Sequence, residues 1–381
     1  MKIHGAVLRK SPAASPFAES RPLDVVELEL DDPRPGELLI RIEAAGVCHS
    51  DLSVIDGNRP RPLPMLLGHE AAGVVEAVGE GVRGVGEGDH VVLVYVPSCG
   101  ACRFCMSGRP ALCTTAMAAN GTGDLVGGGT RIRDSAGEVR HHLGVSGFAT
   151  HAVVDRSSAV VIDKDVPLGT AALFGCAMLT GYGAVNHTAG LRPGESAVVF
   201  GLGGVGLAAV MSAAAAGAYP VVAVDPLPEK RDLALRIGAT HACAPGELDA
   251  LVSEVAPGKF DWAFEAVGSV KVFEQAYAVT GRGGGTVSAG LPHPDSVLQL
   301  PALSIVAENR RVLGSYMGTA QPAVDVPAMI SLWKAGRLPV DQLVSAELGL
   351  ADLNRAMDEL ASGRAVRQVI RPGRTGVGGS Q

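Results

Sequence analysis

A glycine-rich hexapeptide constrains the fold of this chain more than any other feature. Gly201-Leu202-Gly203-Gly204-Val205-Gly206 fits the pattern G-x-G-x-x-G. It follows the apolar run AVVF at 197–200 and opens an alanine-rich stretch, and Asp225 comes directly after the next apolar run, VVAV at 221–224. Strand, glycine turn, helix and second strand with a terminal acidic residue form the dinucleotide-binding fingerprint. The sequence therefore predicts a βαβ unit that binds a dinucleotide.

The residue types in this turn have separate physical roles. One glycine allows the tight turn, one lets backbone N–H groups approach a pyrophosphate, and one lets helix pack on strand. Asp225 is expected to accept hydrogen bonds from ribose hydroxyls, and its negative charge would repel a 2′-phosphate, which favours NAD over NADP. Glycines that merely pack a helix on a sheet are the alternative, and the complete βαβ context disfavours it. The cofactor-binding residues expected in the turn are Gly201, Gly203, Gly204, Val205 and Gly206.

Hydrophobic periodicity separates the two ends of the chain from its middle. Residues 24–43 alternate apolar and polar side chains, and glycines punctuate short valine-rich runs from 68 to 88, which predicts an antiparallel barrel in the first third. After about Gly183, short apolar strands alternate with helices, which predicts a parallel sheet. Besides the two runs above, the expected strands are 260–267 and 284–290, and the expected helices are 229–237, 271–279, 323–335 and 350–361.

Charge and hydropathy exclude several classes of protein. The formal net charge of −7 and the absence of a long basic run argue against nucleic acid or an anionic membrane as partner. The amino terminus, MKIHGAVLRK, lacks the apolar core of a secretory signal, so we expect a cytoplasmic protein. Residues 196–224 carry no charge and suggest a membrane span, but five glycines and Pro220 favour strand, turn, helix and strand instead.

Seven cysteines, an odd number, in a chain without an export signal favour metal ligation over disulfides. Four of them supply enough thiolates in one loop for a closed tetrahedral zinc site, which would be structural. An iron–sulfur cluster is the alternative, but a hydride-transferring enzyme needs no one-electron relay there. These four are Cys99, Cys102, Cys105 and Cys113.

Cys48, His69 and Cys176 are scattered, and each alone is more typical of a core residue than of a metal ligand. Together, two thiolates and one imidazole make a catalytic zinc set that leaves the fourth position free for water or substrate oxygen. Asp51 and Glu70 lie close in sequence to two of these ligands and are natural partners for them.

Five motifs resemble the zinc-dependent alcohol dehydrogenases of the medium-chain dehydrogenase/reductase superfamily, and their order and separations agree along nearly the whole chain. They are GVCHSD (46–51), GHEAAGVVEAVG (68–79), the four-cysteine loop (99–113), GCAMLTGYGA (175–184) and GLGGVG (201–206). The resemblance implies an α/β plus β fold. A GroES-like β-barrel catalytic domain (1–177 and 319–381) carries an inserted Rossmann domain with a doubly wound parallel sheet (178–318), and the active site lies in the cleft between them.

The resemblance also implies roles for individual residues. Cys48, His69 and Cys176 bind catalytic zinc, Asp51 orients His69, Glu70 lies behind the metal, Ser50 takes the hydroxyl proton, Lys230 holds the adenosine ribose, and Arg367 and His49 reach the pyrophosphate. Many relatives complete the proton relay with a histidine where this chain has Ser53, so the exit route stays open between water at Ser53 and the His49 imidazole. The long segment between Cys113 and Cys176 resembles the dimeric branch, so we expect a homodimer.

The predicted function is reversible oxidation of an alcohol to an aldehyde or ketone with hydride transfer to NAD, using two zinc ions per chain. One alternative, a glutathione-dependent formaldehyde dehydrogenase, is disfavoured by Arg59 and Met117, which replace an acidic residue and an arginine. An enzyme that retains its nicotinamide is another. A non-catalytic NAD- or zinc-binding structural protein is disfavoured because the scattered ligands and Ser50 are intact. The identity of the alcohol is left open by the expected pocket residues, Tyr95, Met117, Leu143 and Gly290 to Pro292.

Overall fold

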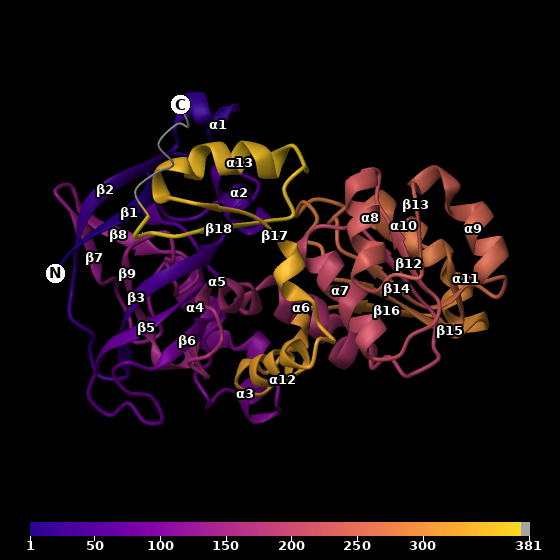
Figure 1. The fold of residues 1–381 in the computed structure, drawn as a ribbon, viewed down its shortest axis with the longest axis horizontal. Coiled ribbons are helices and arrows are strands. Elements are labelled where there is room, and N and C mark those ends of the chain that lie inside the picture. Colours follow the sequence, from indigo (N-terminus) through magenta and orange to yellow (C-terminus); the bar gives the residue numbers. More distant parts are fainter. Residues whose placement is uncertain (375–381) are drawn as a thin grey trace. The chain divides into compact units, whose positions relative to one another are not determined.

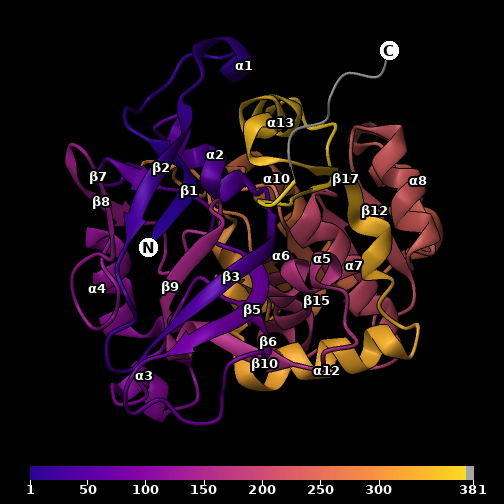
Figure 2. The ribbon, with the colours of Figure 1, turned by 60° about the vertical axis from the view of Figure 1, so that its left-hand side comes forward.

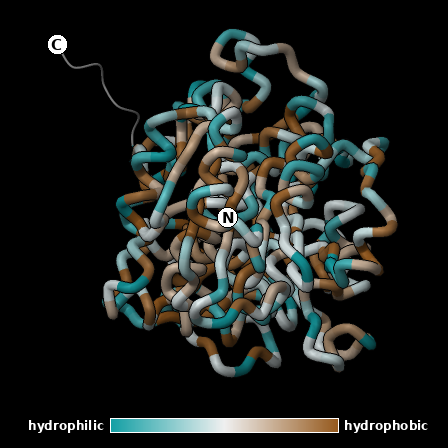
Figure 3. Tube along the Cα trace, turned by 90° about the vertical axis from the view of Figure 1, so that its right-hand side faces the viewer, coloured by the Kyte–Doolittle hydropathy of each residue, from teal (hydrophilic) through white to brown (hydrophobic). Residues whose placement is uncertain are grey.

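The computed structural model describes residues 1–374, which form two compact units (Figure 1). The first contains Met1–Cys176, Gln321–Val326 and the described residues from Val344 onward, and the second contains Ala177–Ala320 and Pro327–Leu343. The division expected from sequence placed all of 319–381 in the first unit, whereas Pro327–Leu343 pack with the second. Hydrophobic and hydrophilic residues alternate along much of the trace (Figure 3), because most elements face a core on one side and solvent on the other.

A small closed barrel forms one part of the first unit. Its strands, in order around the barrel, are β1 (Lys2–Leu8), β2 (Leu23–Leu30), β7 (Ile132–Asp134), β8 (Gly137–His141) and β4 (Met65–Leu66). The β1–β2, β2–β7, β7–β8 and β1–β4 pairs are antiparallel, and the short β4–β8 pair is parallel. The barrel expected for the first third is present, but it also recruits strands from beyond residue 130 and contains this one parallel pair.

A seven-stranded sheet forms the rest of the strand framework of the first unit. Its order is β10 (Ala159–Ile162), β6 (His90–Leu93), β5 (Ala71–Val78), β3 (Glu37–Gly46), β18 (Arg367–Ile370) and β17 (Val344–Leu348), with β9 (His151–Asp155) also paired to β3. Figure 2 shows β3, β5 and β6 side by side. Because β18 pairs with the end of β3, the carboxy-terminal part of the chain lies next to the segment that carries Cys48.

The second unit contains a six-stranded parallel sheet with the order expected of a doubly wound fold. Its strands are β13 (His241–Cys243), β12 (Val221–Val224), β11 (Ala197–Phe200), β14 (Phe260–Glu265), β15 (Thr280–Ser288) and β16 (Arg311–Gly314). Every residue of β11 and β12 is buried, as expected for strands covered on both faces. The main connecting helices are α7 (Gly204–Ala215), α8 (Pro228–Arg236), α9 (Leu248–Val255), α10 (Val270–Ala278) and α11 (Ala302–Ala307).

The remaining helices include two that the sequence predicts near the carboxy terminus. They are α1 (Phe17–Ser20), α2 (His49–Ile55), α3 (Arg103–Met106), α4 (Thr114–Thr122), α5 (Leu168–Ala171), α6 (Ala177–Gly183), α12 (Pro322–Lys334) and α13 (Leu353–Ala361). The predicted helix 350–361 begins with a short 3-10 turn, Leu350–Asp352, before α13.

The uncharged stretch 196–224 forms β11, the glycine turn, α7 and β12, as predicted. Within residues 1–374, no single helix has the length and apolar composition needed to cross a membrane. One bent pair, Leu168–Gly175 with Ala177–Ala189, meets that test only when its two helices are taken together.

A buried ion pair joins the barrel to the large sheet of the first unit. Arg131 donates from Nε to Glu37 Oε2 at 2.9 Å and from Nη2 to Oε1 at 2.5 Å, and the two side chains are 1% and 2% exposed. The backbone N–H of Arg131 also donates to His141 Nε2 at 3.1 Å. Burial, aided by the charge of Arg131, lowers the pKa of His141 to about 3. His141 is therefore a neutral hydrogen-bond acceptor in the folded protein.

His141 makes the stability of this unit depend on pH. In the unfolded chain its pKa is near the ordinary 6.5, so between about 3 and 6.5 the unfolded state binds a proton that the folded state does not. The free energy of unfolding should therefore fall as the pH drops through this window, by on the order of 5 kcal/mol in total. The His141→Gln variant keeps an acceptor without a titration, and its acid-unfolding midpoint, followed by circular dichroism, should move to lower pH. The exposed His293→Gln should leave the midpoint unchanged; equal midpoints for all three proteins would contradict the prediction.

Candidate metal and cofactor sites

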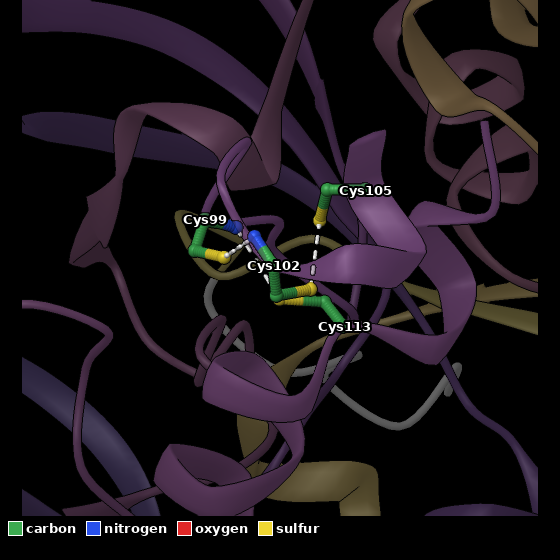
Figure 4. A group of neighbouring side chains, drawn as sticks. All are labelled: Cys99, Cys102, Cys105 and Cys113. Carbon is green, nitrogen blue, oxygen red and sulfur yellow. Dashed lines mark hydrogen bonds between the residues drawn. The ribbon is translucent and has the colours of Figure 1, made fainter. Parts of the chain in front are cut away.

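The four cysteines of the 99–113 loop lie together in the first unit (Figure 4). Their sulfur atoms all lie within 4.8 Å of one another, and all four are free thiols. The Cys102 and Cys105 sulfurs are 3.6 Å apart, close to the roughly 3.8 Å spacing of two sulfurs on one tetrahedral zinc. Four thiolates complete a tetrahedral shell, so this arrangement can hold zinc and leaves no open position.

Local N–H groups prepare these sulfurs for the thiolate form. The backbone N–H groups of Cys99 and Cys102 donate to the sulfurs of Cys113 and Cys99, each at 3.3 Å. Backbone hydrogen bonds, with that of Cys105 the largest, lower the pKa of Cys102 to about 5. Burial and the neighbouring sulfurs raise the pKa of Cys105 to about 12. Such crowding of sulfurs is relieved when a cation binds them.

A second set of metal donors is buried elsewhere in the first unit. Cys48 precedes α2, His69 lies between β4 and β5, and Cys176 ends a short helical turn. Their ligand atoms lie within 4.8 Å of one another although the residues are far apart in sequence. A hydrogen bond from Cys176 holds the pKa of the Cys48 thiol well below its usual range.

The His69 imidazole is oriented as a metal ligand would be. Its Nδ1 lies 3.1 Å from Asp51 Oδ1, and a carboxylate oxygen at that distance requires the proton to sit on Nδ1. Nε2 is then the lone-pair nitrogen. It is buried and has no hydrogen-bond partner among residues 1–374, which is rare for a buried polar atom. With two cysteine thiols beside it, this orphaned nitrogen fits a zinc ion that has three protein ligands and an open fourth position.

Asp51 is fully buried at the start of α2 and binds more than His69. Its Oδ1 accepts the backbone N–H of Gly68 at 3.1 Å and also lies 3.1 Å from Nδ1 of His142. Burial raises the pKa of Asp51, but the charge of His69 and the contact with His142 outweigh it and lower the pKa overall. Burial also lowers the pKa of His142. His142 was not predicted as a site residue, and no spacing motif points to it.

Glu70 and Arg367 form a buried ion pair beside this donor set. Arg367 Nη1 lies 2.9 Å from Glu70 Oε1 and also donates to the carbonyl of Val47 at 3.1 Å. Burial raises the pKa of Glu70 to about 7, although the charge of Arg367 opposes the rise. Gly46 makes room for the carboxylate, because a Cβ there would overlap Glu70. Arg367, expected at a cofactor pyrophosphate, is thus seen in contact with Glu70.

The first turn of α2 carries the residues expected to handle the substrate proton. The Cys48 thiol lies 3.9 Å from Ser50 Oγ, so Ser50 stands beside a metal donor. Ser53 Oγ donates to the backbone carbonyl of His49 at 2.8 Å, so its proton is engaged within its own helix. His49 is exposed at the beginning of this helix.

Two of the expected pocket residues lie next to the His69 and His142 rings. Tyr95 meets the His69 ring edge to face, with the ring centres 5.6 Å apart. Leu143 follows His142 and is buried, with a positive φ of 53°. Met117 on α4 is 51% exposed. Gly290 to Pro292 belong to the second unit.

The glycine turn of the second unit has the geometry of a dinucleotide cradle. Gly201 has a φ of +84°, which favours glycine. A Cβ at Gly206 would overlap the Gly201 carbonyl, so α7 approaches its own turn as only glycine permits. No atom lies within 4 Å of the place where a Gly203 Cβ would be. Gly204 and Val205 begin α7, whose first N–H groups can bind an anion there.

Asp225, at the end of β12, ties this turn to the next strand. Its two carboxylate oxygens accept the backbone N–H groups of Leu202 at 2.8 Å and Leu227 at 2.9 Å. Lys230 lies in the first turn of α8. Arg231, which was not predicted, donates from Nη1 to the Asp225 carbonyl at 2.8 Å. The structure therefore brings the glycine turn and Asp225 together, as the fingerprint requires.

Comparisons with known proteins agree with this geometry. Residues 34–164 match the alcohol dehydrogenase GroES-like domain, and residues 204–335 match the zinc-binding dehydrogenase family. The chain is 39% identical over 366 residues to an NDMA-dependent alcohol dehydrogenase from Amycolatopsis methanolica, covering 95% of this chain and 98% of that protein. It is 36% identical over 368 residues to an S-(hydroxymethyl)glutathione dehydrogenase from Escherichia coli, covering 95% of this chain and all of that protein.

The solved structure of benzyl alcohol dehydrogenase from Acinetobacter calcoaceticus is also similar, with a TM-score of 0.90 and 30% identity. The match covers 97% of this chain and 99% of that one. The fold, the donor sets and these relatives lead to one assignment. The chain belongs to the zinc-dependent alcohol dehydrogenases of the medium-chain dehydrogenase/reductase superfamily, oxidoreductases that act on CH–OH groups.

Proposed function

We propose that this protein oxidises a small alcohol to an aldehyde or ketone with NAD, and that each chain holds one catalytic and one structural zinc. One observation carries the proposal. The ligand atoms of Cys48, His69 and Cys176 converge within 4.8 Å in a buried site, and Nε2 of His69 has no hydrogen-bond partner in the described chain. A purely structural protein has no need for a donor set with an open position.

The residues around this site then divide the chemical work. Zinc, when bound, supplies a Lewis acid that lowers the pKa of the alcohol hydroxyl, and NAD, when bound, supplies the hydride acceptor. Cys48, His69 and Cys176 hold the metal. Asp51 keeps the proton of His69 on Nδ1, so that Nε2 offers its lone pair. Ser50, beside Cys48, accepts the hydroxyl proton of the substrate.

The second unit supports NAD as the cofactor. The carboxylate of Asp225 is fixed by two backbone N–H groups at the end of β12. Its remaining lone pairs can accept hydrogen bonds from ribose hydroxyls, whereas its negative charge opposes a 2′-phosphate. We place Lys230 at the same ribose, and His49 and Arg367 at the pyrophosphate. Arg367 would then divide its donors between the cofactor and Glu70.

Metal analysis tests the two zinc sites separately. The wild-type protein should contain two zinc ions per chain. Cys48→Ser should retain one zinc and a wild-type melting temperature but lose turnover, because only the catalytic donor set is damaged. Cys102→Ser should lose the other zinc and stability, because a structural zinc contributes folding energy directly. Zinc per chain is read by mass spectrometry, and NADH formation is read with aliphatic, allylic and aromatic alcohols. A single zinc in the wild type, or full turnover in Cys48→Ser, would refute the assignment.

Two further variants separate proton transfer from cofactor binding. Ser50→Ala should lower kcat about 100-fold or more and leave the Kd for NAD unchanged, because it removes only a proton acceptor. Gly203→Ala should instead weaken NAD binding at least about 10-fold by occupying the open face of the turn. It should not alter the melting temperature, since nothing in the protein lies within 4 Å of the added methyl.

Matched controls exist for both variants. Ser53→Ala removes a hydroxyl from the same helix that already donates to His49, and Gly246→Ala adds a methyl to open space away from the turn. Both should behave like the wild type. An unchanged kcat in Ser50→Ala with hydride transfer shown to be rate-limiting, or unchanged NAD binding in Gly203→Ala, would contradict the corresponding role.

Two relatives define the alternatives in substrate and cofactor use. The similarity to an S-(hydroxymethyl)glutathione dehydrogenase raises that thiol adduct as a substrate, but Arg59 and Met117 depart from the pattern for binding it. The similarity to an NDMA-dependent enzyme supports a second candidate, in which the nicotinamide stays bound between turnovers. Nicotinamide co-purifying with the protein, and turnover with NDMA in place of added NAD, would favour the second candidate.

We also propose that two copies of the chain form a homodimer through the edge of the six-stranded sheet. β16 ends this sheet and, among the described residues, pairs only with β15. An unusual concentration of exposed apolar side chains surrounds it. This apolar edge comprises Leu291, Val297, Leu298, Leu303, Ile305, Val306 and Val312. Unpaired strand edges and apolar patches both favour association, and a twofold axis would let β16 pair antiparallel with its own copy.

The dimer proposal is tested by making the apolar edge charged. Leu303 and Val306 are 78% and 83% exposed, so Leu303→Glu combined with Val306→Glu should not disturb the monomer fold. The wild type should sediment at twice the chain mass of 38.9 kDa, and the double variant at the mass of one chain. Val324→Glu, at a residue 63% exposed on α12, is the control and should remain dimeric. A monomeric wild type or a dimeric double variant would refute this interface.

A further inference from the structure

His142 lies against both Asp51 and His69 in the buried part of the first unit. Its side chain is 1% exposed, and its Nδ1 lies 3.1 Å from Asp51 Oδ1. That nitrogen has no hydrogen bond to any other group among residues 1–374. Because the nearest atom is a carboxylate oxygen, Nδ1 must carry the proton. The ring also meets His69 edge to face, with ring centres 5.5 Å apart and planes at 78°.

The turn that carries His142 is fastened to the backbone in front of His69. The N–H groups of Gly147 and Phe148 donate to the carbonyls of Gly68 at 3.0 Å and Leu67 at 3.1 Å. Ser146 Oγ accepts the backbone N–H of His142 and donates to the Leu66 carbonyl, both at 3.0 Å. These four bonds connect 142–148 to 66–68, so the position of His142 relative to His69 is fixed by main chain.

Asp51 depends on few contacts to hold its carboxylate. Its Oδ1 meets three groups, the Gly68 N–H, His69 Nδ1 and His142 Nδ1, all at 3.1 Å. Its Oδ2 is buried and has no hydrogen-bond partner in the described chain. Nothing attached to Oδ2 therefore resists rotation of the carboxylate. The contacts of Oδ1 with Gly68 and His142 must supply this restraint, and only that of His142 comes from a side chain.

We propose that His142 is a positioning residue for the catalytic metal, holding Asp51 so that Asp51 in turn holds the His69 ring. This inference rests on the proposed ligand set of Cys48, His69 and Cys176. His142 touches neither the metal donors' sulfurs nor the substrate position in this account. It acts through Asp51 and through ring packing on His69. Loss of such outer partners typically weakens metal binding 10- to 100-fold.

Two variants of opposite character test which property of His142 matters. His142→Phe keeps an aromatic ring against His69 but removes the N–H that faces Asp51. His142→Asn removes the ring but keeps an amide N–H near the place of Nδ1. Each is compared with His141→Gln, which changes the neighbouring buried histidine, whose Nε2 bonds Arg131 rather than Asp51.

The readout is release of metal from the holoenzyme to a coloured chelator, which needs no turnover. Wild type should release two zinc ions in two phases, and the phase that Cys48→Ser lacks reports the catalytic site. In His142→Phe this phase should be about 10- to 100-fold faster, while release of the structural zinc is unchanged. His142→Asn and His141→Gln should stay within a few-fold of wild type. The visible absorption of the cobalt-substituted protein should shift in His142→Phe and not in His141→Gln.

Each possible result bears on the proposal. Wild-type release from His142→Phe would overturn it, and equally fast release from His142→Asn and His142→Phe would overturn the role of the N–H. If His142→Phe loses its structural zinc and fails to fold, His142→Asn is compared with His142→Gln, whose amide lies at the Nε2 place; equal rates would overturn the proposal. A wild type that holds only one zinc per chain would instead refute the catalytic metal site itself.

Discussion

The buried carboxylate of Asp51 and the imidazole it holds are the interaction around which the first unit is organised. Burying a carboxylate without partners costs several kcal/mol, and the chain reduces that cost with one backbone N–H and two imidazoles. What remains unsatisfied is the Nε2 of His69, beside two cysteine thiols. A divalent cation satisfies this nitrogen and both sulfurs at once. The donor set is therefore built for a metal rather than for packing.

The topology explains how distant residues reach this site. β3 is central to the large sheet, where it pairs with β5, β9 and β18. Its end delivers Gly46 and Cys48, and the start of β5 delivers Glu70. β18, more than 300 residues later, brings Arg367 to Glu70. A carboxylate whose burial raises its pKa to about 7 needs such a cation nearby, so the carboxy-terminal strand supports the same site electrostatically.

Most of the framework could be predicted from sequence because its signals are local. The glycine turn with Asp225, the four-cysteine loop and the apolar strand runs each lie within a short window, and the structure places each as a unit. Cys48, His69 and Cys176 were identifiable only as a set, through the motifs around them. His142 and the Glu70–Arg367 contact escaped prediction because they depend on strand pairing between segments far apart in sequence. A histidine in a turn has no local pattern that reveals a carboxylate approaching from another helix.

The proton path shows how a local substitution can be read once the structure is known. From sequence, Ser53 stood where a relay histidine is often found, and its hydroxyl was one candidate for continuing the path. In the structure that hydroxyl donates to the His49 carbonyl, one turn back in the same helix. A serine bonded in this way is satisfied and has no second proton to pass on without breaking the bond. Of the two groups the sequence left open, exposed His49 is therefore the better proton acceptor after Ser50, because its imidazole can take a proton and meet solvent directly.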